Sequence, residues 1–270
     1  MYETRITIFI DILGFRNIIK QTESNQTLQQ KIFEVLNSMT TENLQNEMFA
    51  ELNLKGDGDE ERKKLKESQA SFSKTLLSKS SIITTHFSDS IVLSINLEID
   101  MYAMSLFEYI GRLIYRLWKD FHILIRGGVA VEGLIHENNG VLFGPAMVKA
   151  YDIETNLANF PRIIFDDLSH NIVKNSPFYP AMKHLFKDFS GSNKIEIKKG
   201  LEINLATVFS HLLNSHFSFH PLKKQEILET IENSKIQLAK LIEENTANER
   251  VRSKYQYLKD ELENVKYPTY

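Results

Sequence analysis

The stretch "FIDILGF", residues 9–15, decides how this chain is interpreted. It places one carboxylate, Asp11, at the end of an apolar and aromatic run, and Gly14 follows three residues later. Such a run is typical of a buried strand, and the glycine marks its end. A buried carboxylate without a partner costs several kcal/mol. Backbone N–H groups of the next turn, an arginine or a metal ion would each remove that cost.

The composition is that of an ordinary globular protein. Of the 270 residues, 42% are hydrophobic and 25% are charged, with a net charge of −3. This balance gives no general attraction to nucleic acid or to an anionic membrane, so we expect neither as a partner. There are no cysteines, which excludes disulfides, zinc–thiolate sites and thiol nucleophiles. No secretory signal and no run of 18 apolar residues is present, so we expect a cytoplasmic protein.

Alternating strand and helix patterns predict an α+β fold. The expected order is β-α-α-β-β-α-β-β-α-β, followed by a mainly helical region. The expected elements include strands at 5–11, 122–136 and 162–167, a hairpin around 86–90, and helices at 101–121 and 144–157. Gly127 and Gly128 lie inside the second of these strands, where glycine marks a bulge or a close backbone approach.

Two regions are expected. Residues 1–167 form the first, with a charged, exposed insertion at 53–79, and residues 168–270 form the second, mainly helical one. The second region also contains "NKIEIKKGLEINL", residues 193–205, for which we expect a hairpin turning at Lys199 and Gly200.

Asp89 is the expected partner of Asp11. It lies at the turn of the predicted hairpin, 78 positions (89 − 11) along the chain. In a βααββαβ sheet the first strand and this hairpin are neighbours, so the two carboxylates meet at one edge. Two such carboxylates repel each other, and a divalent cation between them removes the repulsion. Of the three ways to compensate the Asp11 carboxylate, a metal ion therefore fits best. Each aspartate alone also fits a plain turn or strand end.

Four motifs, in order, resemble the catalytic domain of class III nucleotidyl cyclases over about residues 1–165. They are "FIDILGF", "HFSDSIVLS" (86–94), "IRGGVAVEG" (125–133) and "VLFGPAMVKAYDIE" (141–154). The resemblance implies a ferredoxin-like, antiparallel cyclase-type sheet with helices on one face. It also makes the cyclases of bacterial anti-phage Pycsar systems a plausible branch.

The resemblance assigns roles to residues near both aspartates. Two Mg²⁺ or Mn²⁺ ions would be held by Asp11, Asp89 and the main-chain carbonyl of Ile12. The substrate-binding positions that it implies are Gly14, Phe15, Arg16 and Ser88. The implied reaction converts a nucleoside triphosphate to a 3′,5′-cyclic nucleotide and pyrophosphate in a head-to-tail homodimer.

The chain departs from the family at two positions of the last motif. Val148 and Asp152 stand where cyclases carry an asparagine and an arginine that stabilise the transferring phosphate. An aspartate repels the developing negative charge. Arg126 and Lys149 are the candidate catalytic cations, although Arg126 also fits a surface ion pair. The alternative functions are a cyclase-like module that binds nucleotide or a protein partner without turnover, and a scaffold built on the helical tail.

Overall fold

The computed structural model describes residues 1–43, 82–97, 100–190, 195, 197–214 and 224–268. The predicted insertion at 53–79 lies outside these residues. No described helix is long and apolar enough to cross a membrane.

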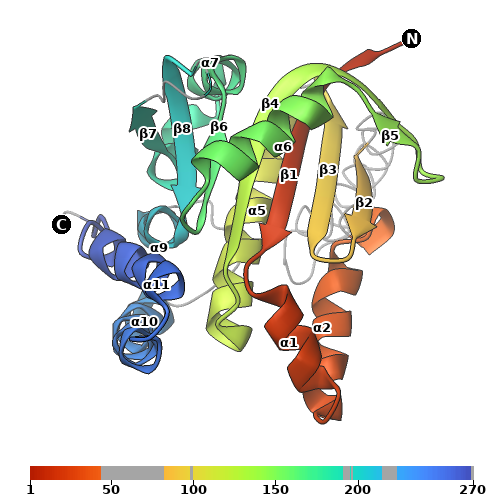
Figure 1. The fold of residues 1–270 in the computed structure, drawn as a ribbon. Helices are drawn as coiled ribbons and strands as arrows, with labels where there is room; N and C mark the ends of the chain where they lie inside the picture. The colour runs from red at the N-terminus through yellow and green to blue at the C-terminus, as the bar shows by residue number, and fades with distance from the viewer. Residues whose placement is uncertain (44–81, 98–99, 191–194, 196, 215–223, 269–270) are drawn as a thin grey trace, which may run out of the picture.

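An eight-stranded sheet forms the centre of an α+β fold, as predicted (Figure 1). Its path runs β2-β3-β1-β4-β6-β8-β7, with β5 paired to β4. All described pairings are antiparallel except β4 with β6. The strands are β1 (Glu3–Ile12), β2 (Ile83–Phe87), β3 (Ser90–Asn96), β4 (Ile125–His136), β5 (Leu142–Phe143), β6 (Arg162–Phe165), β7 (Lys187–Ser190) and β8 (Lys199–Asn204).

The helices follow the predicted order through the first region. They are α1 (Phe15–Thr22), α2 (Gln26–Ser38), α5 (Asp100–Phe121), α6 (Pro145–Leu157), α7 (Asp167–Asn175), α8 (Tyr179–Met182), α9 (Leu205–Asn214), α10 (Lys224–Glu244) and α11 (Glu249–Leu262). Within the described residues, the βααββαβ order and the hairpin of β2 and β3 are confirmed.

Strand β1 is buried on both faces, which explains why its central residues 6–10 are apolar except for Thr7. Ile6, Ile8 and Ile10 point into the larger core with α5, whereas Phe9 belongs to a smaller core with Ala150 of α6. The expectation of helices on one face is therefore wrong: α6 covers the face opposite to α5 (Figure 1). The sheet is covered on both sides because β1 and β4 present apolar side chains in both directions.

Gly128 allows α6 to lie directly on β4. A Cβ atom at this position would sit 2.1 Å from the carbonyl oxygen of Ala150 and 2.8 Å from Cβ of Ile153. At Gly127 it would sit 2.4 Å from the carbonyl oxygen of Phe9. The close backbone approach expected for these two glycines is confirmed.

The second region extends the same sheet. Strand β8 pairs with β6 and with β7, so Lys199 begins a strand and the expected turn at Lys199 and Gly200 is wrong. The alternating pattern of residues 193–205 suggested a hairpin within that stretch, but β8 pairs with residues 187–190. Helices α9, α10 and α11 add Phe209, Ile231 and Leu258 to the larger core. One hydrophobic core thus spans both predicted regions.

Candidate functional site

The end of β1 and the turn of the β2–β3 hairpin bring Asp11 and Asp89 together. Asp11 lies opposite Ser90 in the antiparallel register, and the backbone N–H of Ile12 donates to the carbonyl of Asp89 over 2.9 Å. The turn between the strands holds Ser88 and Asp89, and Ser88 has a φ of 58°. The fold therefore places both aspartates at one end of the sheet, as the sequence predicts.

Both aspartates line one cavity of about 340 Å³. Its walls come from the end of β1, the start of α1, the hairpin turn, β4 and α11. The lining residues are Asp11, Ile12, Leu13, Gly14, Phe15, Arg16, Asn17, Asp89, Arg126, Arg250 and Lys254. Six of the predicted metal and substrate positions thus share one cavity, together with Arg126. Ser88 and Lys149 do not line it.

The loop between β1 and α1 is shaped by Gly14. This residue precedes the first residue of α1 with a φ of 76°, a left-handed conformation that glycine adopts without steric cost. Phe15 is buried in the larger core and fixes the start of the helix. The first backbone N–H groups of a helix lack intrahelical acceptors and attract anions. The start of α1 therefore adds to the positive character of the cavity.

Arg126 connects Asp11 to a second carboxylate behind it. Its Nε lies 2.9 Å from Oδ2 of Asp11, and its Nη2 lies 2.7 Å from Oε1 of Glu154 on α6. The Glu154 side chain is only 3% exposed, whereas those of Asp11 and Arg126 are 20% and 19% exposed. Burial raises the pKa of Glu154 above its ordinary value, and the charge of Arg126 opposes this shift. Arg126 thus compensates one buried carboxylate and one at the cavity wall.

Positive charge exceeds negative charge along the cavity. Four cationic side chains line the cavity with two carboxylates, and Glu154 lies behind Arg126. The cations are Arg16, Arg126, Arg250 and Lys254. Within the part of the chain that the structure describes, the charged groups of Arg16, Arg250 and Lys254 have no hydrogen-bond or ion-pair partner. This arrangement suits a polyanionic ligand.

The donor set fits a divalent cation that shares its ligands with a substrate. Among the described residues no group of three or more His, Cys, Asp or Glu side chains could hold a metal by itself. Mg²⁺ commonly takes only one or two carboxylates from the protein and completes its shell with phosphate and water oxygens. Asp11, Asp89 and Ile12 meet that requirement, with one Asp11 oxygen bonded to Arg126.

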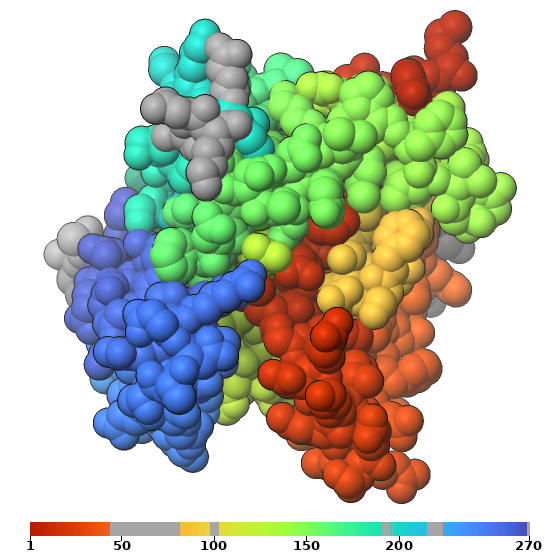
Figure 2. Space-filling model, in the orientation of Figure 1, coloured from red at the N-terminus to blue at the C-terminus, as the bar shows by residue number. Residues whose placement is uncertain are grey.

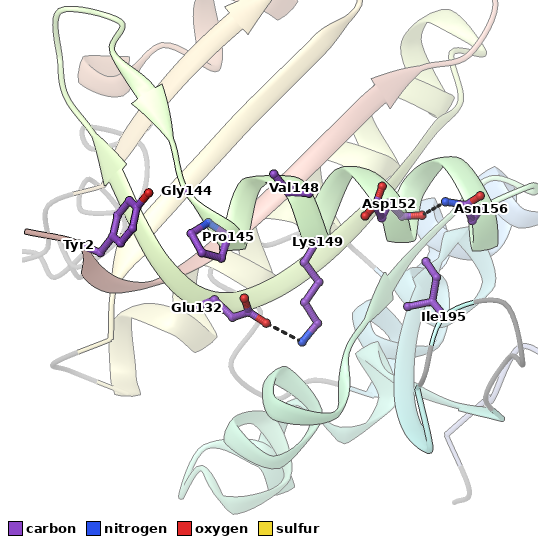
Figure 3. Close-up of a pocket in the computed structure, with 9 residues that line it drawn as sticks. All are labelled: Tyr2, Glu132, Gly144, Pro145, Val148, Lys149, Asp152, Asn156 and Ile195. Carbon is purple, nitrogen blue, oxygen red and sulfur yellow. Dashed lines mark hydrogen bonds and ion pairs between the residues drawn. The ribbon is translucent and has the colours of Figure 1, made fainter.

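Lys149 lies at a different hollow, of about 790 Å³, beside α6. Its ammonium is 2.7 Å from Oδ2 of Asp166. It is also 3.1 Å from Oε1 of Glu132, and Figure 3 shows this second contact. Burial acts to lower the pKa of Lys149, but these two carboxylates outweigh burial and raise it. Val148 and Asp152 line the same hollow. Within one chain, this group is therefore separate from the cavity of Asp11.

Arg250 and Lys254 were missed by sequence reasoning. They lie one helical turn apart on α11, in a lysine- and glutamate-rich segment that resembles any solvated helix. The spacing of four was the only signal, and it does not show what the helix packs against.

Comparisons with known proteins found similar solved structures but no matching sequence. No family model and no curated protein sequence matches the chain. An adenylate/guanylate cyclase/hydrolase from Silicibacter pomeroyi is 14% identical, covers 76% of this chain and 98% of its own, and has a TM-score of 0.43. The adenylyl cyclase CyaB from P. aeruginosa is 9% identical, with 75% and 94% covered and a TM-score of 0.40. At such identities and scores, the site residues alone carry the functional argument.

Proposed function

We propose that this protein converts a nucleoside triphosphate to a 3′,5′-cyclic nucleotide and pyrophosphate. The observation that carries the proposal is the shared cavity, in which Asp11 and Asp89 lie beside the Gly14 turn and an excess of cations. In the reaction, the ribose 3′-oxygen bonds to the α-phosphorus, and the bond from that phosphorus to the oxygen bridging to the β-phosphate breaks.

In this proposal, some cavity residues bind the metal ions and others bind the phosphates. Asp11, Asp89 and the carbonyl of Ile12 would hold two Mg²⁺ or Mn²⁺ ions, which supply a lowered pKa at the 3′-hydroxyl and charge neutralisation at the leaving pyrophosphate. Phe15 fixes the start of α1, and Gly14 shapes the turn that faces the phosphates. Arg16 and Ser88 are proposed as further substrate contacts, from the cavity wall and from the hairpin turn.

A head-to-tail homodimer belongs to the same proposal. In it, the partner copy would bring its α6 hollow, with Lys149, Val148 and Asp152, to the cavity of Asp11. Val148 and Tyr151 are 60% and 48% exposed, which leaves apolar surface on α6 for such a contact. The mass of the purified protein in solution, measured by light scattering, tests this part.

A second candidate is a cyclase-like module that binds nucleotide without turnover. Two observations favour it. Arg126 occupies one oxygen of Asp11, and Lys149 is held between Asp166 and Glu132, away from the cavity. In this case the cavity holds a triphosphate. Of the two predicted catalytic cations, Arg126 lines this cavity and Lys149 does not.

An assay with isosteric variants separates the two. The purified chain is incubated with each of the four nucleoside triphosphates and Mn²⁺, and cyclic product and pyrophosphate are quantified by mass spectrometry. We expect product from the wild type and none from Asp11→Asn or Asp89→Asn. Asp120→Asn, an exposed carboxylate near the end of α5, is the matched control and should leave activity unchanged. Nucleotide binding without product supports the second candidate, and undiminished product in Asp11→Asn refutes the first.

We further propose a role in bacterial anti-phage signalling in the cytoplasm, on the strength of the resemblance to Pycsar cyclases. Expression in a bacterial host, followed by phage challenge, tests it. Protection that requires Asp11 and Asp89 would support the role, and equal plaque counts with wild type and Asp11→Asn would refute it.

A further inference from the structure

Helix α11 forms one wall of the cavity although it lies about 240 residues after β1 in the sequence. Arg250 and Lys254 project from it, one turn apart, toward the cavity of Asp11 and Arg126. Figure 2 shows atoms of the C-terminal helices (blue) reaching those of the N-terminal segment (red) on this face. The last helix and the first strand thus share one site.

Neither cation forms an ion pair with the nearby carboxylates that the structure describes. In the described part of the chain neither side chain forms a hydrogen bond or ion pair, whereas Arg252 on the same helix pairs with Glu249. Burial lowers the pKa of Lys254, and the charges of Arg126 and Arg250 lower it further, while the charges of Asp11 and Glu154 oppose this shift only in part. An anion bound between these groups would reverse that unfavourable interaction.

Helix α11 is firmly attached at this position. The ring of Tyr257 stacks on that of Phe160 at 4.6 Å, and its hydroxyl donates to Glu202 on β8 over 3.2 Å. Asn204 donates to Glu261 over 3.0 Å, one turn further on. Leu258 and Leu262 are buried in the larger core. The backbone of α11 is therefore fixed at the cavity before any ligand arrives, with the side chain of Lys254 half-buried and that of Arg250 exposed.

We propose that Arg250 and Lys254 bind the phosphate chain of the substrate, so that α11 supplies part of the triphosphate site from within the same chain. This rests on the proposed function in taking a nucleoside triphosphate as the anion. Guanidinium and ammonium groups both form short, charge-assisted hydrogen bonds to phosphate oxygens. Arg16 and the start of α1 line the same cavity. A phosphate chain would then lie between α1 and α11, above the two aspartates.

The test uses inorganic tripolyphosphate, which carries the phosphate chain and no base or sugar. Its dissociation constant is measured by calorimetry on the full chain, for the wild type, Lys254→Met and Arg250→Gln. We expect each variant to bind at least about tenfold more weakly. Lys259→Met is the matched control, since Lys259 lies on α11 but does not line the cavity, and it should bind as the wild type does. Lys254→Arg should retain binding within a few fold.

The outcomes separate this inference from the proposed function. Wild-type affinity in both Lys254→Met and Arg250→Gln overturns the inference, and so does a wild type that binds no tripolyphosphate. Equal weakening by Lys259→Met also overturns it, because the effect would then be one of net charge. Weakened tripolyphosphate binding in the two cavity variants, together with no cyclic product from the wild type, would leave the inference standing and refute cyclisation.

Discussion

Replacing Arg126 with methionine should destabilise the protein in a pH-dependent way. The guanidinium sits between Asp11 and Glu154, with N–O distances of 2.9 and 2.7 Å. Asp11 is 20% exposed and can recruit water, but Glu154 is 3% exposed and cannot. The loss of Arg126 therefore leaves one buried carboxylate without its charge partner, which is costlier than losing a surface pair.

Protonation limits the size of this penalty. The ordinary pKa of a glutamate carboxyl is 4.5, about 2.5 units below pH 7. Protonating it at pH 7 therefore costs free energy at about 1.36 kcal/mol per unit. The Glu154 contribution should therefore reach about 3 kcal/mol at pH 7 and fall below about 1 kcal/mol at pH 5. The sign follows from the raised pKa of folded Glu154: the protonated form loses nothing at low pH, and stability is lost as the pH rises through the folded pKa.

Urea unfolding of the wild type, Arg126→Met, Glu154→Gln and the double variant at pH 5 and pH 7 measures these values. The double variant should recover most of the stability at pH 7, because it holds no buried charge at Glu154. A penalty in Arg126→Met that is the same at both pH values, or that the added Glu154→Gln leaves in place, would show that the stability does not come from compensation of Glu154.

Three further perturbations have defined outcomes. Gly128→Ala places a Cβ 2.1 Å from a backbone oxygen of α6 and should lower the unfolding free energy by about 3 kcal/mol. Gly14→Ala should lower it by only about 1 kcal/mol, because only the positive φ is unfavourable there. Urea unfolding compares the two variants, and equal losses would contradict the close packing of α6 on Gly128. Burial, aided by Arg5, lowers the pKa of His136 to about 4, so stability should fall by up to about 3 kcal/mol as the pH drops from 6.5 to 4, and His136→Gln should flatten that slope in acid titrations. Lys254→Met should raise the stability of the ligand-free protein at pH 7, and the gain should fade as the pH rises through the lowered pKa of folded Lys254; no gain in thermal unfolding would contradict the unfavourable burial of this cation.

The first half of the fold could be predicted because its signals are local. The apolar run ending at Asp11 and the turn at Asp89 each mark an element by neighbouring residues alone. The position of α6 on the second face was not predicted, since it depends on the packing of Gly128 against Ala150, which are far apart in sequence. Strand β8 was misjudged for the same reason: its partners β6 and β7 are set by the sheet and not by the adjacent residues.

The site was predicted to a similar extent. The motif around Asp11 and the hairpin around Asp89 located two walls of the cavity. Arg126 was a candidate because it lies in the third cyclase-like motif and could supply a missing catalytic cation. The contribution of α11 was not foreseeable, because Lys254 sits in a charged helix whose only sequence property is amphipathicity. Which side of such a helix meets the sheet is decided by tertiary contacts such as those of Tyr257.

The cavity joins Asp11 to Lys254, so one of its walls is synthesised long before the other. The aspartate strand leaves the ribosome well before the helix that carries Arg250. Until that helix has docked, a nascent chain exposes its carboxylates and the start of α1 without the cations beside them. Recognition of a polyanion by this pocket would therefore report that α11 has been made and has docked beside the sheet.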